Sequence, residues 1–153
     1  MILLEIRKLQ NHEDAPIDLL LQADPSERQI RKYLERGSCF IALLSDSVIG
    51  ECVLLPTRPG TAELVNIAVS APHQGKGIGK KLVLHAIEQA RLQGSHAIEI
   101  GTGNSSIDQI ALYQKCGFRI TGIDRDYFIR HYEEKIYENG IQCVDMVRLA
   151  MDL

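Results

Sequence analysis

A glycine- and lysine-rich run near the middle of the 153-residue chain has the residue types and spacing of an anion-binding loop. It reads Gln74-Gly75-Lys76-Gly77-Ile78-Gly79-Lys80. It joins a predicted strand, residues 62–69, to a predicted helix, residues 78–93. Glycines let several backbone N–H groups turn toward one point, and the N-terminus of a helix adds positive potential. The run therefore predicts a binding site for a phosphate or pyrophosphate group.

Three ligand classes use such loops, and the spacing separates them. A Walker A loop requires GxxxxGK followed by Ser or Thr, whereas Gln74 stands at its first glycine position and Lys81 follows Lys80. A dinucleotide loop requires GxGxxG, but Lys80 stands where the last glycine belongs. The spacing fits the third class, a loop for the pyrophosphate of coenzyme A.

The elements around this loop are those of a mixed α/β protein. The hydrophobic pattern predicts strands over residues 2–8, 39–44, 48–55, 62–69, 97–101, 118–123 and 142–151. It predicts a helix that Asp24 caps and Gly37 ends, and two more over residues 78–93 and 106–115. Leu82 and Leu84 are expected on the apolar face of the helix over residues 78–93. Residues 124–140 are long for a hairpin connection, and such length is often functional.

Two blocks of the sequence resemble the GNAT superfamily of N-acetyltransferases. In the first, the family carries Arg or Gln, two residues, Gly, one residue, then Gly or Ala, which matches Gln74, Gly77 and Gly79. The preceding strand, residues 63–69, is similar to the family's central splayed strand. The second block has an Asn and then Leu-Tyr, three residues, Gly-Phe. It matches Asn104, Leu112, Tyr113, Gly117 and Phe118.

The resemblance implies a fold and a cofactor. The fold is a central mixed, mostly antiparallel sheet flanked by helices, and the co-substrate is acetyl-CoA. Backbone groups along the central strand pair with the pantetheine arm, and an N–H there polarises the thioester carbonyl. Asn104 either contacts the pantetheine arm or fixes the loop after the fifth strand. The predicted cofactor-binding residues are Ile67, Ala68, Val69, Gln74, Gly75, Lys76, Gly77, Ile78, Gly79, Lys80 and Asn104.

Two side chains are predicted to do the chemistry. By the resemblance, the Tyr113 hydroxyl lies beside the sulfur of coenzyme A, and its ordinary pKa keeps the proton that an acid needs. Glu63 lies eleven positions before Gln74, the register of the catalytic base in GNAT histone acetyltransferases. Glu51 on the neighbouring strand, or a water, is a rival base. A domain that binds acyl-CoA as a sensor or interaction module, without turnover, stays a second hypothesis.

The acceptor stays open between polyamines, aminoglycosides, amino acids and protein amines. Aromatic and acidic residues in residues 124–140 could cradle a small cationic amine, or form a surface loop or a homodimer contact.

Charge and composition argue against several other classes of function. A net charge of −3 argues against a nucleic-acid binder. The four cysteines form no CxxC pair and the five histidines have no ligand spacing, so no metal is expected. No apolar run is long enough to span a membrane. The sequence is expected to form one soluble, cytoplasmic domain over residues 1–153.

Overall fold

The computed structural model describes residues 3–153. Their elements, in chain order, are β1 (Leu4–Lys8), α1 (Ile17–Ala23), α2 (Glu27–Arg36), β2 (Ser38–Leu44), β3 (Ser47–Arg58), β4 (Thr61–Val69), a 3-10 turn (Ala71–His73), α3 (Ile78–Leu92), β5 (Ala97–Gly103), α4 (Ile107–Lys115), β6 (Arg119–Asp124), α5 (Tyr127–His131), β7 (Ile136–Glu138), β8 (Ile141–Cys143) and β9 (Met146–Asp152). Within this part of the chain, no helix has the length and apolar character needed to cross a membrane.

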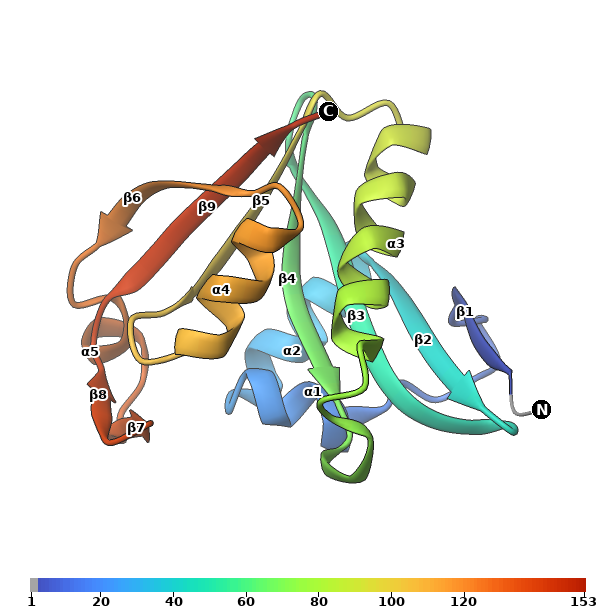
Figure 1. Cartoon of the computed structure of the whole chain (residues 1–153), viewed down its shortest axis with the longest axis horizontal. Coiled ribbons are helices and arrows are strands. Elements are labelled where there is room, and N and C mark those ends of the chain that lie inside the picture. Colours follow the sequence, from blue (N-terminus) through green and yellow to red (C-terminus); the bar gives the residue numbers. More distant parts are fainter. Residues whose placement is uncertain (1–2) are drawn as a thin grey trace.

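Seven of the strands form one twisted sheet in the order β1-β2-β3-β4-β5-β9-β6 (Figure 1). Only β4 and β5 are parallel, and every other neighbouring pair is antiparallel. Strands β7 and β8 form a separate two-stranded sheet. The expected mixed, mostly antiparallel sheet is therefore confirmed.

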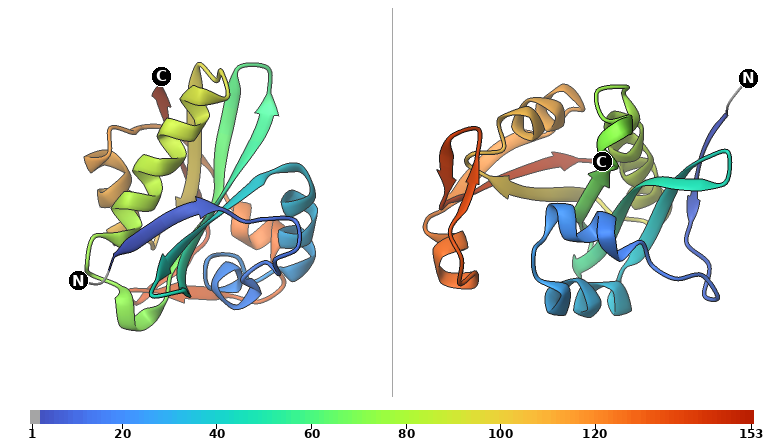
Figure 2. Two further views of the ribbon diagram at one scale, coloured as in Figure 1. Left: turned by 90° about the vertical axis from the view of Figure 1, so that its right-hand side faces the viewer. Right: turned by 90° about the horizontal axis from the view of Figure 1, so that it is seen from below.

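Helices cover both faces of this sheet, and each face has its own core. Helices α3 and α4 lie over one face, whereas α1, α2 and α5 lie on the other (Figure 2). The α3 side buries a large cluster that includes Leu64, Leu82 and Tyr113. The α1–α2 side buries a smaller one built on Leu20, Ile30, Cys39, Ile41 and Val53. Successive strand residues alternate between these two cores.

The structure corrects several element boundaries. The N-cap of α2 is Ser26, whose Oγ accepts a hydrogen bond from the N–H of Gln29 (3.2 Å), and not Asp24. Strand β3 runs through Pro56 instead of ending there. Leu84 is 45% exposed, because two residues turn a helix by about 200° and carry it away from Leu82.

The C-terminal region also differs from expectation. The predicted strand over residues 142–151 is divided between β8 and β9. The connection over residues 124–140 contains α5 and β7. Ile2, expected at the start of the first strand, lies outside the described residues.

Candidate active site

The sheet opens at its centre, where β4 and β5 separate. The two strands pair only from Thr61 opposite Ala97 to Leu64 opposite Ile100. Beyond that point β4 continues to Val69 paired with β3 alone, and Figure 1 shows β5 diverging from it. Residues 65–69 therefore present one strand edge without a strand partner among the described residues. Such an edge can pair with an extended ligand through main-chain hydrogen bonds.

The glycine loop lies at the end of this open edge. Gly75 and Gly77 adopt left-handed conformations, with φ of 75° and 82°, and a Cβ on either would meet no atom within 4 Å. The first hydrogen bond inside α3 runs from the N–H of Lys81 to the carbonyl of Gly77 (3.2 Å). The N–H groups of residues 78–80 consequently have no intrahelical acceptor. Open space, free N–H groups and a helix N-terminus suit an anion.

Gln74 ties the loop to the strand. Its amide Nε2 donates to the carbonyl of Val69 over 2.9 Å, so its side chain orients the loop at the end of β4. Lys80 lies near enough to Cys116, at the end of α4, to lower the pKa of that thiol, although burial is the larger effect and raises it. The start of α3 and the end of α4 therefore meet beside the opening.

Tyr113 lies on the α3–α4 face. It is 3% exposed, and its ring meets Phe118 edge to face, with centroids 6.2 Å apart. Burial is the main cause that raises the pKa of its hydroxyl. The hydroxyl thus keeps its proton at neutral pH, as an acid must.

Glu63 lies on the opposite face of the sheet. Its neighbours Ala62 and Leu64 point into the α3 core, so Glu63 points toward the α1–α2 side. Its carboxylate is 3.7 Å from Nη1 of Arg148. Burial, the largest effect, raises its pKa, while Arg148 opposes that rise and Glu99 on β5 adds to it. Tyr113 and Glu63 therefore approach the β4–β5 opening from opposite faces.

Asn104 is engaged within the protein. Its Oδ1 accepts the N–H groups of Val144 (2.8 Å) and Asp145 (3.0 Å), and its Nδ2 donates to the carbonyl of Gln142 (3.1 Å). Both ends of the amide thus hold the β8–β9 segment against the loop after β5. These bonds favour the loop-fixing alternative, and a pantetheine contact stays a prediction.

A hydrogen-bonded chain that sequence reasoning missed crosses the Glu63 face. Asn66 donates from Nδ2 to the Tyr33 hydroxyl (2.8 Å), and Tyr33 donates to Oδ2 of Asp24 (3.3 Å). Tyr132, 108 positions further along the chain than Asp24, donates to Oδ1 of the same carboxylate (3.0 Å). The one available signal was Asn66, which with Glu63 is one of two polar residues in the predicted strand over residues 62–69.

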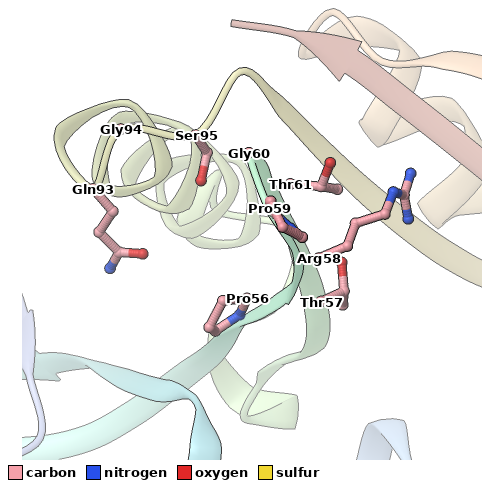
Figure 3. A pocket seen from close by; sticks show the side chains of 9 residues that line it. All are labelled: Pro56, Thr57, Arg58, Pro59, Gly60, Thr61, Gln93, Gly94 and Ser95. Atoms are coloured by element: carbon pink, nitrogen blue, oxygen red, sulfur yellow. The ribbon is translucent and has the colours of Figure 1, made fainter.

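A shallow pocket of about 380 Å³ lies elsewhere, between the β3–β4 turn and the α3–β5 turn (Figure 3). Pro56, Gly60 and Gln93 are among its lining residues. The nine residues of β4 separate this end of the sheet from the glycine loop, a span of roughly 26 Å. Its only charged lining residue is Arg58, so it offers no acid or base to the chemistry.

The opening, the glycine loop and the two opposed side chains together form the candidate active site. The sequence matches the acetyltransferase (GNAT) family over residues 4–118. The chain therefore belongs to the GNAT family of acetyltransferases.

Similar proteins agree with this membership. The chain is 59% identical to an uncharacterised N-acetyltransferase of Bacillus subtilis, YvbK, over 98% of this chain and 97% of that protein. A crystal structure of a B. subtilis acetyltransferase in complex with CoA matches with a TM-score of 0.93 and 59% identity, covering 98% and 99% of the two chains. A GNAT acetyltransferase from Elizabethkingia anophelis with acetyl-CoA bound matches with a TM-score of 0.96 and 43% identity, covering 98% of each chain.

Proposed function

We propose that the chain transfers the acetyl group of acetyl-CoA to a primary amine of a small molecule or a protein, by direct attack in a ternary complex. The observation that carries the proposal is the β4–β5 opening, which has the glycine loop at one end and acid–base residues on its two faces. The CoA and acetyl-CoA complexes of the similar proteins support the choice of donor.

The cofactor would be held mainly by backbone. The glycine loop, residues 74–80, takes the pyrophosphate, and the free edge of β4 at Ile67, Ala68 and Val69 pairs with the pantetheine arm. An N–H on this edge hydrogen-bonds to the thioester carbonyl and stabilises the charge that develops on its oxygen. Fixing the thioester beside the acceptor also removes much of the entropic barrier to reaction.

Tyr113 and Glu63 each carry out one of the two proton transfers. The amine nitrogen attacks the carbonyl carbon, the C–S bond breaks, and the sulfur takes a proton from the Tyr113 hydroxyl. The proton lost by the amine goes to Glu63, directly or through a water, and the tyrosine recovers a proton from solvent. Glu51 or a water alone remains the rival base, and a positioned acid or base contributes roughly 10²–10⁴-fold.

A panel of amines tests this function. Purified protein with acetyl-CoA and a panel of polyamines, aminoglycosides, amino acids and peptides should release free CoA thiol with at least one class. Protein that binds acetyl-CoA but releases thiol with none of them would instead support the sensor or interaction module. The cytoplasmic location and the homodimer stay predictions.

A further inference from the structure

Glu51 on β3 is a fully buried acidic residue whose carboxylate is unpartnered among the described residues. Its side chain is 0% exposed, and neither carboxylate oxygen has a hydrogen-bond partner within residues 3–153. An ionised carboxylate loses several kcal/mol of solvation in such a place unless it is paired. Nearly all buried polar atoms in native proteins have a partner. Glu51 therefore needs either a proton or a donor from outside the protein.

A second unpartnered acceptor lies beside it. The Oδ1 atom of Asn66 is buried without a hydrogen bond, while its Nδ2 donates to the carbonyl of Leu20 (3.0 Å) and to the Tyr33 hydroxyl. In the β3–β4 register Glu51 is opposite Ala68 and Val53 is opposite Asn66. Glu51 and Asn66 are thus diagonal neighbours on one face, a relation that places two residues about 7–8 Å apart with their Cβ atoms somewhat closer. One small group can contact both.

The surroundings supply no positive charge to this pair. Tyr33, Cys39 and Cys52 each feel the negative charge of Glu51, which adds to the burial that raises the pKa of these groups, to about 12 for Cys39. Two described cations on this face are already paired, Arg7 with Glu13 (2.7 Å), in the same cross-strand row as Glu51, and Arg148 with Glu63 (3.7 Å). Neither is among the causes that shift the pKa of Glu51, which burial alone raises. Three unpartnered oxygen acceptors without a cation are complementary to an ammonium group, which has one charge and three N–H donors.

The pair also lies next to the proposed reaction centre. Asn66 and Ala68 belong to residues 65–69, the part of β4 whose other edge faces the β4–β5 opening. Helices α1 and α2 pack against β3 and β4 on this face. Tyr33, Asp24 and Tyr132 continue the hydrogen-bonded chain from Asn66 there. A bound group would thus lie beside the thioester, on the face against which these helices pack.

We propose that Glu51 and Asn66 form the subsite that binds the nitrogen of the acceptor, and that this subsite selects primary ammonium groups. This inference rests on the proposed function. The N–H donors contact Oε1 and Oε2 of Glu51 and Oδ1 of Asn66 before the nitrogen loses its proton and attacks. A quaternary ammonium has the charge without the donors, and an alcohol lacks the charge, so both are excluded.

Benzylamine, trimethylbenzylammonium and benzyl alcohol separate these requirements. Each is titrated by calorimetry into protein saturated with CoA, and benzylamine should bind at least tenfold more tightly than the other two. In the Glu51→Gln variant its affinity, and its kcat/KM with acetyl-CoA, should fall at least tenfold, while acetyl-CoA affinity stays within twofold. Glu88→Gln is the matched control, because Glu88 is exposed on α3 and pairs only with Arg91 (3.4 Å).

The outcomes distinguish an amine-binding role of Glu51 from a purely structural one. If Glu51 is merely buried and binds no ligand, Glu51→Gln and Glu51→Met should raise the melting temperature and leave the affinity for benzylamine unchanged. This result would overturn the inference. Equal binding of the quaternary ion, or no binding of benzylamine, would overturn it as well. Absence of thiol release from wild type, combined with Glu51-dependent benzylamine binding, would overturn the proposed function and leave the subsite standing.

Discussion

Glu63 and Glu51 share one face of the sheet but differ in their surroundings. The Glu63 side chain is 24% exposed and lies near Arg148, whereas Glu51 has no exposure and no partner within the described chain. Burial raises the pKa of both carboxyls, to about 8 for Glu51. Arg148 partly offsets the rise for Glu63. The two residues are therefore suited to different tasks, proton acceptance for Glu63 and amine binding for Glu51.

The Glu63→Gln substitution should lower turnover most at low pH, because there the largest share of the acceptor is an ammonium that needs a base. Acetyl-CoA affinity should barely change. A pH profile of kcat/KM checks this, with Glu99→Gln as the control. Glu99 raises the pKa of Glu63, so this control should shift the acidic limb to lower pH without removing it. A profile for Glu63→Gln that superimposes on wild type would move the base role to Glu51 or to water.

The raised pKa of Glu51 makes stability depend on pH. Its folded pKa is about 8 against an ordinary 4.5, so the folded state binds the extra proton between these values. The contribution of this protonation to the free energy of unfolding is therefore complete below about pH 4.5. It is lost as pH rises toward 8, by up to about 1.4 kcal/mol per pH unit. Urea unfolding at pH 5.5–8 should show this slope in wild type and not in Glu51→Gln. Parallel curves for the two proteins would contradict it.

The Tyr113→Phe substitution tests the acid. It keeps the ring contact with Phe118 and removes a hydroxyl, so stability should change by about 1 kcal/mol at most. The single-turnover rate should fall by roughly 10²–10⁴-fold, and the defect should shrink with an acyl donor whose thiol is more acidic. Single-turnover kinetics avoid masking by slow product release. Equal rates for both proteins would remove Tyr113 from the mechanism.

At the scale of elements, the two ends of α3 provide a matched pair of glycines. Gly77 before the helix and Gly94 after it have φ of 82° and 85°, and a Cβ on either would meet nothing within 4 Å. Valine at either position should impose a similar backbone strain, about 1–2 kcal/mol. Only Gly77→Val also blocks the approach of a phosphate. Calorimetry should therefore show weakened acetyl-CoA binding, by tenfold or more, for Gly77→Val alone, and equal losses in both variants would refute the loop assignment.

The elements with strong local signals could be predicted from sequence. The 78–93 helix has a broad apolar face and a glycine at each end, and the structure has α3 within one residue of these bounds. Helix α1 was not predicted because it has only seven residues and no side-chain cap, so packing on β4 stabilises it more than local propensity does. The division between β8 and β9 depends on Asn104, 38 or more residues away, which no local pattern records.

The candidate site likewise contains residues that could be predicted from sequence and residues that could not. The glycine loop and the Leu-Tyr block are contiguous in sequence, so spacing alone was sufficient to propose them. The hydrogen-bonded chain Asn66–Tyr33–Asp24–Tyr132 joins four segments. Only the register of β3 with β4 brings Glu51 beside Asn66. These residues could not be grouped before the topology was known.

At the scale of the whole molecule, bound acetyl-CoA should pair with the free edge of β4 and so extend the central sheet. Acetyl-CoA at 100 times its Kd should stabilise the protein by about 2.7 kcal/mol and raise its melting temperature, with ATP and NAD acting far less. Hydrogen exchange should slow at the amides of residues 65–69 and 74–80 together, because one ligand contacts both. A larger stabilisation by ATP or NAD would contradict the choice of cofactor.

The strand order has a consequence for how the chain is synthesised. Strand β9 lies between β5 and β6, and within residues 3–153 no other strand pairs with β6. During synthesis, β6 emerges from the ribosome before β9. It must therefore stay unpaired until the β9 residues emerge. Domains assemble as their segments become available during translation. Strands β1 to β5 can thus associate early, whereas β6 can join the sheet only after β9 has emerged.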